Sequence, residues 1–245
     1  MSQPDLAYLD VSGRRIAYRH RAGARPTLLF LPGYASDMEG AKAVAVDGFA
    51  AARGIGCLRL DYSGTGSSAG DFAEGTLGRW TGEALAALDA LTEGPVIPVG
   101  SSMGGWIALH LALARPERVA ALVGIAAAPD FTDWGLTTGQ KERIVRDGLL
   151  EEPNPYGPEP FRTYRSFWES GQTMRLLERP IAIDCPVRLV HGAADADVPI
   201  AIAHRLMEWL RSADVQLLTI KGGGHRLSEP REIEAILRTL GGLLE

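Results

Sequence analysis

Residues 95–106 read PVIPVGSSMGGW and contain the pentapeptide Gly-x-Ser-x-Gly at positions 100–104. The apolar run before the pentapeptide is typical of a buried strand, and the stretch from Trp106 to Ala114 is helical in character. A serine on a sharp turn between a strand and a helix presents its hydroxyl to a cleft, beside backbone N–H groups at a helix N-terminus. We therefore predict that Ser102 is a nucleophile.

The same pentapeptide pattern occurs a second time, at residues 66–70, where the central serine is Ser68. The pattern alone is therefore weak, and its surroundings must separate the two matches. Residues 61–65 are already turn-like, and residues 71–75 show no helical periodicity. We interpret Ser68 as part of a glycine-rich loop.

Strand and helix patterns alternate along most of the chain. Apolar strands are predicted at residues 27–31, 56–60, 96–99, 119–125, 187–191 and 215–220, and helices at 39–53, 77–91, 103–115, 200–212 and 230–240. Residues 6–20 form two alternating segments around a turn, which predicts an N-terminal antiparallel hairpin. Strands that are apolar on both faces indicate a sheet covered by helices on both sides. The predicted class is α/β, with a mostly parallel eight-stranded sheet.

The alternation fails between residues 130 and 184, which lack an apolar strand. We predict a small helical cap here, inserted into a core made of residues 1–129 and 185–245. Ligands of such sheets bind at the carboxyl ends of the strands, where an insertion after a strand would lie. The candidate substrate-binding residues are five aromatic side chains of the cap: Trp134, Phe161, Tyr164, Phe167 and Trp168. The sequence leaves open whether these rings line an acyl pocket or only pack the cap onto the core.

Composition excludes several classes of function. The 245 residues carry a formal charge of −5 with no long block of like charge, so binding to nucleic acid is disfavoured. The longest apolar runs are too short and glycine-interrupted to span a membrane. The first residues show no export or transit pattern, so we expect a cytoplasmic location. Cys57 and Cys185 flank predicted buried strands and are interpreted as small hydrophobic residues, with no metal site.

A serine nucleophile needs a base, and the chain has five histidines. His20 lies in the predicted hairpin, His110 and His204 fall within helices, and His191 closes a strand. Only His225 stands in a loop after the last strand, directly after three glycines, whose freedom allows a backbone bend toward the strand ends. We predict that His225 is the general base.

The base needs a carboxylate that orients it, and three aspartates are candidates. Asp195 and Asp197 lie in the loop that leaves the strand 187–191. Asp195 is the preferred acid, because Asp197 stands next to Val198-Pro199 at a helix start and suits a helix N-terminal carboxylate. Asp130, at the end of an earlier strand, is the remaining rival. The order Ser102, Asp195, His225 is that of the α/β-hydrolase fold.

The reaction also needs backbone donors for the developing oxyanion. One predicted donor is the N–H of Met103, the residue after the nucleophile. The other is the N–H of Tyr34, in the loop after the strand 27–31, where Gly33 permits an unusual turn. An ordinary Pro-Gly turn is the alternative at this position.

Several segments together resemble a known family: LPGY at 31–34, LDYSGTGS at 60–67, GSSMGGW at 100–106, ARPE at 114–117 and CPVRLVHG at 185–192. They are similar to the α/β-hydrolase branch that contains a mitochondrial palmitoyl-protein thioesterase, also described as an acyl-glucuronide esterase. The resemblance implies a serine hydrolase of the carboxylesterase or acyl thioesterase type. It also implies a small-molecule or acylated substrate and no cofactor.

Other functions stay open at this point. A peptidase or amidase of the same fold is one alternative, and a non-catalytic ligand-binding protein on this scaffold is another. Four arginines suit either an anionic leaving group or a solvated surface: Arg162, Arg165, Arg175 and Arg226. The oligomeric state is not readable from the sequence.

Overall fold

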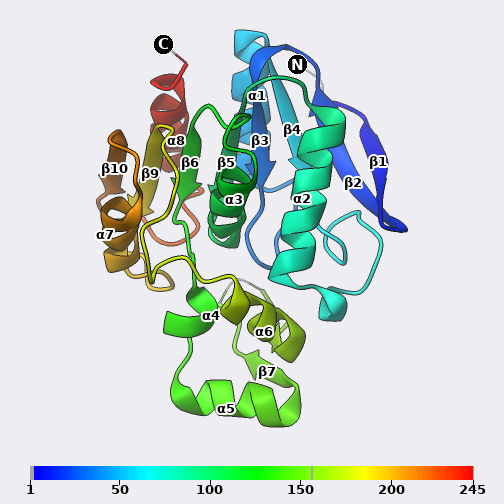
Figure 1. Ribbon diagram of the computed structural model, residues 1–245, viewed down its shortest axis with the longest axis vertical. Coiled ribbons are helices and arrows are strands. Elements are labelled where there is room, and N and C mark those ends of the chain that lie inside the picture. Colours follow the sequence, from blue (N-terminus) through cyan, green and yellow to red (C-terminus); the bar gives the residue numbers. More distant parts are fainter. Residues whose placement is uncertain (1–2, 156, 245) are drawn as a thin grey trace.

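The computed structural model describes residues 3–155 and 157–244. Its centre is an eight-stranded sheet with the strand order β1-β2-β4-β3-β5-β6-β9-β10 (Figure 1). The strands are β1 (Leu6–Val11), β2 (Arg14–Arg21), β3 (Ala24–Leu31), β4 (Ile55–Leu60), β5 (Val96–Ser101), β6 (Leu122–Ile125), β9 (Val187–Gly192) and β10 (Val215–Ile220). Strand β2 is antiparallel to both of its neighbours, and the remaining pairs are parallel. The predicted fold class is confirmed.

Helices cover both faces of the sheet, as strands that are apolar on both faces require. Helices α1 (Ala41–Arg53) and α8 (Pro230–Gly241) pack on one face, and α2 (Leu77–Leu91), α3 (Met103–Ala114) and α7 (Ile200–Trp209) pack on the other (Figure 1). Every residue of β4 and β5 is buried. The segment that carries Ser102 is therefore held between two apolar layers.

The predicted boundaries differ from the observed ones mainly where a strand or helix meets a loop. Strand β3 begins three residues before the predicted start at Thr27, and β6 begins only at Leu122. Val119, which was predicted to start that strand, makes an isolated bridge to Val96. A short 3₁₀ helix, η1 (Phe72–Glu74), follows the glycine-rich loop.

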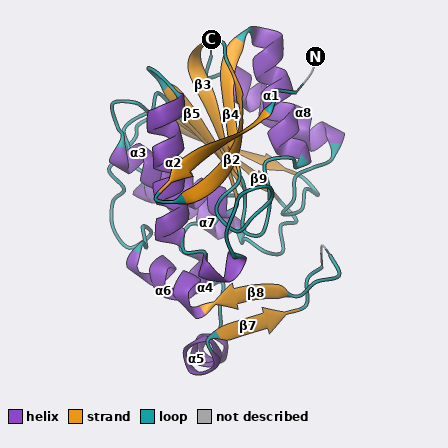
Figure 2. Ribbon diagram, turned by 90° about the vertical axis from the view of Figure 1, so that its right-hand side faces the viewer, coloured by secondary structure: helices purple, strands orange, loops and turns teal. Residues whose placement is uncertain are grey.

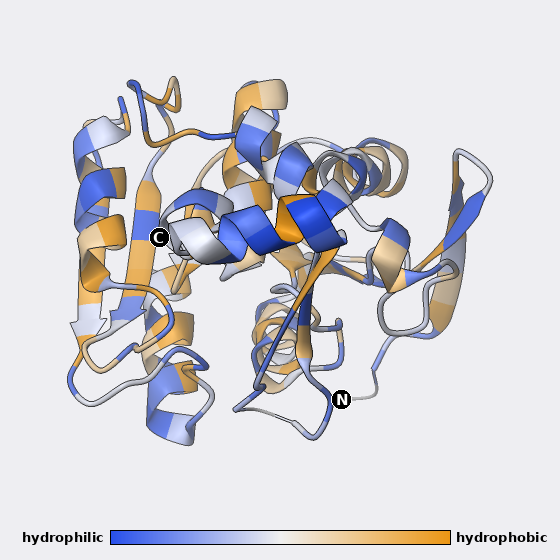
Figure 3. Ribbon diagram, turned by 90° about the horizontal axis from the view of Figure 1, so that it is seen from below, coloured by the Kyte–Doolittle hydropathy of each residue, from blue (hydrophilic) through white to orange (hydrophobic). Residues whose placement is uncertain are grey.

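The segment between β6 and β9 forms a separate layer beyond the carboxyl ends of the parallel strands (Figures 1 and 2). It contains α4 (Phe131–Trp134), α5 (Thr138–Asp147), β7 (Leu149–Glu152), β8 (Phe161–Tyr164) and α6 (Arg165–Thr173). We refer to residues 130–184 as the cap. The outermost helix, α5, presents a largely hydrophilic surface when the molecule is viewed from the cap side (Figure 3).

The antiparallel pair β7 and β8 is a feature of the cap that the sequence did not predict. Its strands have four residues each, and charged residues interrupt them. The Arg162 guanidinium on β8 donates to the Glu151 carboxylate on β7 at 2.8 Å, at directly paired positions. A short strand stabilised by a cross-strand ion pair lacks the apolar run by which the other strands were predicted.

Within the described ranges, no helix combines the length and the apolar character that crossing a bilayer requires.

Candidate active site

Ser102 lies on the turn between β5 and α3, with φ 54° and ψ −118°. A non-glycine residue with positive φ is strained and persists only where its surroundings hold it. The N–H of Ser102 donates to the Ile125 carbonyl at 2.9 Å, and its own carbonyl accepts from the Ala128 N–H at 3.1 Å. These bonds from β6 and the residues after it fix the strained turn and leave the side chain at its tip.

The two outer glycines of the pentapeptide are required by close backbone contacts. A Cβ at Gly100 would lie 2.2 Å from the Gly104 carbonyl oxygen. A Cβ at Gly104 would lie 2.0 Å from the Leu31 carbonyl oxygen. No side chain fits at either position, so the pattern around Ser102 follows from the packing of β3 against the start of α3.

The second pentapeptide has a different environment. The Ser68 hydroxyl donates to the Asp61 carbonyl at 2.7 Å and accepts from the Ala17 N–H at 2.8 Å. Both bonds tie the glycine-rich loop to β2 and to the end of β4. The structure thus places Ser68 in a loop, as the sequence analysis interpreted it.

The structure brings Ser102, His225 and Asp195 together, although they are far apart in the sequence. Ser102 Oγ lies 3.0 Å from His225 Nε2, and His225 Nδ1 lies 3.0 Å from Asp195 Oδ2. His225 stands in the loop between β10 and α8, with Gly222 in the left-handed region at φ 72°. The His225 side chain is 16% exposed and that of Asp195 only 1%. An Nδ1–H that donates to the carboxylate leaves Nε2 free to accept the serine proton.

Asp195 is held as a charged acceptor. Its Oδ1 accepts from the backbone N–H groups of Asp197 and Val198, each at 2.9 Å. Burial acts to raise the pKa of Asp195, but the hydrogen bond from His225 and those from the two amides outweigh it, so the pKa lies below its usual value. Asp197 is itself exposed and contributes its N–H to this arrangement. The two aspartates of this loop therefore make different contacts: Asp195 contacts His225 through its side chain, whereas Asp197 contacts Asp195 through its backbone N–H.

Asp130, the third candidate acid, is used at the base of the cap. Its carboxylate accepts from the Leu176 N–H at 2.8 Å and from the Leu177 N–H at 2.7 Å. The residue is 3% exposed and has φ 61°. Burial raises the pKa of Asp130, and the two amide donors act against that rise. Asp130 therefore joins the beginning of the cap to its end.

We expect Asp130→Asn to lower the free energy of unfolding by about 1–3 kcal/mol, because an amide NH₂ would face a buried backbone donor. Urea denaturation of the purified variant measures the change. Asp147→Asn, which alters an exposed carboxylate of the same cap, is the control and should stay within about 0.5 kcal/mol of the parent. Equal unfolding midpoints for the two variants would contradict the role given to Asp130.

The two predicted oxyanion donors belong to two segments that adjoin Ser102. Met103 is the first residue of α3, where backbone N–H groups have no partner within the helix. A Cβ at Gly33 would lie 3.3 Å from Ser102 Cβ, so the loop that carries Tyr34 packs directly against Ser102. Neither the Met103 N–H nor the Tyr34 N–H donates to an acceptor in the part of the chain that the structure describes.

The predicted substrate-binding rings of the cap largely pack against other groups. Phe167 is 1% exposed, and its ring centre lies 4.5 Å from that of Tyr34. Trp134 and Trp168 donate their indole N–H groups to the carbonyls of Pro129 and Thr132. In this arrangement the rings hold the cap together and hold it on the core.

Phe161 and Tyr164, both half-buried, complete the set. The Phe161 ring lies 5.3 Å from that of Tyr34, and the Tyr164 ring lies 6.3 Å from that of Phe72. Both face core residues in the loops that follow β3 and β4. Phe72 was not among the candidates, because nothing in its local sequence indicates a contact with the cap.

His191 was not predicted to belong to the site, but it lies beside Asp195. It is 1% exposed, and its Nε2 lies 2.9 Å from the Val198 carbonyl oxygen and 3.5 Å from Asp195 Oδ2. Its position near the end of β9, four residues before Asp195, could have indicated this contact from the sequence. His191 stabilises the loop that carries Asp195.

Three of the four arginines considered for an anionic leaving group form ion pairs within the cap. Arg162 contacts Glu151 at 2.8 Å, Arg165 contacts Glu169 at 2.7 Å, and Arg175 contacts Glu178 at 2.8 Å. These pairs favour the interpretation of a solvated face for Arg162 and Arg165, which are 40% and 49% exposed, whereas Arg175 is half-buried.

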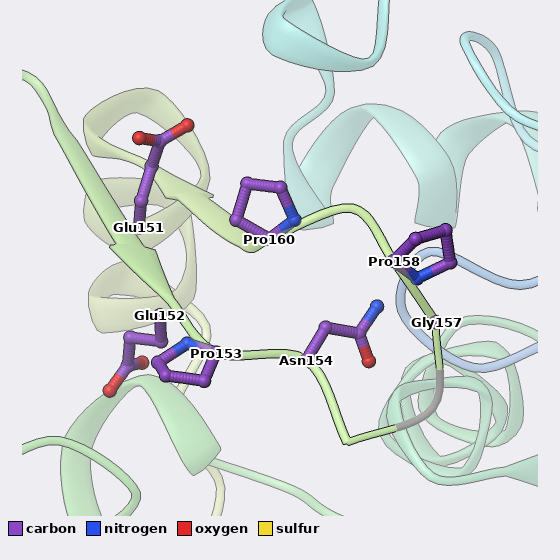
Figure 4. A pocket seen from close by; sticks show the side chains of 7 residues that line it. All are labelled: Glu151, Glu152, Pro153, Asn154, Gly157, Pro158 and Pro160. Atoms are coloured by element: carbon purple, nitrogen blue, oxygen red, sulfur yellow. The ribbon is translucent and has the colours of Figure 1, made fainter.

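Two surface cavities lie away from the serine. One, of about 430 Å³, is lined by the last two residues of β7 and by five residues between β7 and β8: Glu151, Glu152, Pro153, Asn154, Gly157, Pro158 and Pro160 (Figure 4). The other lies between the β1–β2 turn and α2. Asp195, Asp197 and His225 have ligand atoms close enough for a metal ion. However, Asp195 and His225 already contact each other there, so the hydrogen-bond chain accounts for this grouping.

The chain is similar in sequence and in structure to known α/β-hydrolases. The family model described as alpha/beta hydrolase fold matches residues 26–152. Human palmitoyl-protein thioesterase ABHD10, mitochondrial, is 38% identical over 249 residues, which cover 100% of this chain and 79% of that protein. Mouse alpha/beta hydrolase domain-containing protein 10 superposes with a TM-score of 0.92 at 40% identity, over 98% of both chains. A putative hydrolase from Agrobacterium vitis S4 has the same score and identity, over 98% of this chain and 99% of its own.

One prediction is corrected by these relatives. The human relative and those from Pongo abelii, Mus musculus, Bos taurus and Rattus norvegicus are all named mitochondrial, so the predicted cytoplasmic location is wrong. That prediction depended only on the lack of a recognisable export or transit pattern in the first residues. The lack of a pattern does not identify a compartment.

Proposed function

Since the chain belongs to the α/β-hydrolase family, we propose that it hydrolyses acyl thioesters and carboxylic esters through an acyl-enzyme on Ser102. The observation that carries this proposal is the continuous hydrogen-bond chain from Ser102 through His225 to Asp195, with 3.0 Å at each step. A serine hydroxyl is a weak nucleophile unless a neighbouring base takes its proton. His225 is within reach of that proton, and Asp195 orients the imidazole.

In the first half of the reaction, Ser102 Oγ attacks the acyl carbonyl carbon while His225 Nε2 takes the hydroxyl proton. The carbonyl π electrons move to oxygen, which becomes the oxyanion. Asp195 stabilises the imidazolium and stays ionised. When the tetrahedral intermediate collapses, the C–S or C–O bond breaks, and His225 returns the proton to the departing thiolate or alkoxide.

In the second half, water attacks the acyl carbon, and His225 Nε2 now takes a proton from the water. A second tetrahedral oxyanion forms and collapses, which breaks the bond to Ser102 Oγ. His225 returns the proton to the serine, and the products are a carboxylic acid and the regenerated enzyme. No other reactant is needed.

We propose that the N–H groups of Met103 and Tyr34 donate hydrogen bonds to the oxyanion. Both donors are backbone groups beside Ser102, because one begins α3 and the other lies in the loop packed against Ser102. Donors that need no reorganisation in the transition state are the most effective kind. This arrangement supports hydrolysis more than passive ligand binding, which needs no such donors.

The relatives named palmitoyl-protein thioesterase favour an acylated substrate with a thiol leaving group. We assign residues 130–184 to a cap that covers this substrate, and residues 1–129 with 185–245 to the catalytic core. In this assignment, half-buried cap rings such as Tyr164, which packs on Phe72, contact the acyl chain. The cap thus determines which acyl groups fit.

A fluorophosphonate probe tests the proposal directly. We expect one phosphonyl group per chain, formed when Ser102 Oγ displaces fluoride, and no adduct on heat-denatured protein. Proteolysis and mass spectrometry should find the adduct on a peptide that contains Ser102 and not Ser68. An unlabelled native protein would support the ligand-binding alternative, and an adduct on Ser68 would contradict the assignment of the nucleophile.

A further inference from the structure

We refer to residues 32–40, between β3 and α1, as the oxyanion loop. Tyr34 lies in this loop and also contacts the cap. Its backbone follows Gly33, which packs against Ser102. The residue is 8% exposed, and its ring packs on rings of the cap. One residue therefore links the neighbourhood of the nucleophile with the layer above it.

The Tyr34 ring is the centre of an aromatic cluster drawn from the core and the cap. The ring centres around it lie 4.5–6.0 Å away: Phe72 and Trp80 from the core, and Phe131, Phe161 and Phe167 from the cap. Aromatic pairs at these separations add to the free energy gained from burial. Lifting the cap would remove three of the five contacts.

The Tyr34 hydroxyl forms a directional contact with the cap. It donates to the Arg162 carbonyl on β8 at 2.8 Å. Burial raises the pKa of Tyr34, so the hydroxyl stays protonated and keeps its role as donor. Because the acceptor is a backbone atom, the bond depends on where the cap lies and not on which side chain stands at position 162.

The other end of the oxyanion loop is fixed to the sheet. The Met38 N–H donates to Asp61 Oδ1 at 2.7 Å, and the Met38 carbonyl accepts from Arg59 Nη1 at 2.7 Å. Both partners are buried side chains at the end of β4 and just after it. The loop is thus anchored by the core at Met38 and by the cap at the Tyr34 side chain, and the Tyr34 N–H lies beside the second anchor.

We propose that the Tyr34 side chain is a positioning group that couples the seating of the cap to the alignment of the oxyanion donor. This inference rests on the proposed function. With the cap seated, the hydroxyl bond and the ring packing hold the Tyr34 N–H toward Ser102. With the cap lifted, the side chain loses its acceptor and the cap rings, and the donor is no longer held. Rapid acyl transfer then requires a seated cap as well as a bound substrate.

The Tyr34→Phe variant isolates this coupling, because it keeps the backbone N–H and the ring and removes only the hydroxyl. We expect kcat for an acyl thioester to fall about fivefold to tenfold, with KM within twofold of the parent, as for the loss of one buried hydrogen bond used in the transition state. The inhibition constant of a trifluoromethyl ketone, whose adduct places an oxyanion in the same position, should rise by the same factor. A purely structural role would not link these two changes.

Ser170→Ala is the matched control. Ser170 Oγ accepts from the Gly78 N–H at 3.0 Å, which is another hydrogen bond between cap and core that does not touch the oxyanion loop. We expect kcat and the ketone inhibition constant of this variant to stay within twofold of the parent. Equal losses in the two variants would overturn the inference, since they would indicate a general loosening of the cap.

The outcomes also separate this inference from the proposed function. If the parent enzyme turns over thioesters and binds the ketone, and Tyr34→Phe does both equally well, only the coupling is overturned. If the parent enzyme neither turns over nor binds the ketone, the hydrolase assignment fails before the variant is considered. Thermal denaturation of both variants verifies that each is folded at the assay temperature.

Discussion

Replacing Ser102 with alanine is expected to lower kcat for an acyl thioester by about 10⁶-fold, the scale of loss when a serine hydrolase loses its nucleophile. The variant keeps the oxyanion donors and the cap but has no oxygen that can form the acyl-enzyme. Its fold should be retained, because the turn is held by backbone bonds to Ile125 and Ala128 and alanine is smaller than serine. Steady-state assays with long incubation and freshly purified protein measure the residual rate.

Ser68→Ala is the control, since Ser68 occupies the centre of the second copy of the same pentapeptide pattern. It should cost about 1 kcal/mol of stability through the lost bonds to Ala17 and Asp61, while kcat stays within threefold of the parent. A residual activity of Ser102→Ala above about a hundredth of the parent would show that the nucleophile lies elsewhere.

Asp195→Asn is expected to lower kcat by about 10⁴-fold without unfolding the protein. The amide oxygen would still accept from the Asp197 and Val198 N–H groups, so its NH₂ would face His225 Nδ1. Nδ1 would then have to accept, which moves the imidazole proton to Nε2, and Nε2 could no longer take the proton of Ser102. Kinetics at several pH values, together with circular dichroism, distinguish this loss from misfolding.

Asp197→Asn provides a control in the same loop. Asp197 is exposed and contributes its backbone N–H to Asp195, which the substitution retains. We expect kcat within threefold of the parent. If Asp197→Asn instead shows the larger loss of the two, the assignment of the acid must be exchanged between these residues.

The central parallel strands were predictable from the sequence because they are apolar at most positions, and the β1–β2 hairpin was predictable because its residues alternate around a turn. Strands β4 and β5 are buried throughout, and a continuous apolar run is the direct consequence of helices on both faces. The family resemblance, stated on five short segments, is confirmed by the comparisons. The cap was less predictable, since β7 and β8 are short and depend on a cross-strand ion pair between Glu151 and Arg162.

The sequence predicted that Ser102, Asp195 and His225 act together, and the structure brings them into one hydrogen-bond chain, whereas the contact of Asp130 with the end of the cap could not be predicted. Asp130 and Asp195 each follow a strand and are each buried, and only their hydrogen-bond partners differ. The contact of the Tyr34 hydroxyl was also beyond prediction, because its acceptor is a carbonyl 128 residues away in the sequence. Every residue has a backbone carbonyl, so the residue type at position 162 does not indicate this hydrogen bond.

The hydrogen bonds of Asp130 to Leu176 and Leu177 join the two ends of the cap, which allows the segment between them to vary among related proteins. A single carboxylate holds the first residue of the insertion beside Leu176 and Leu177 near its end, so the two ends of the segment between them are held together at its base. The entropic cost of closing a loop rises only slowly with its length. Segments of different length and composition can therefore be exchanged above this point while β6 and β9 stay in register. Under the proposed function, exchange of this segment would change the range of substrates and leave Ser102, Asp195 and His225 unchanged.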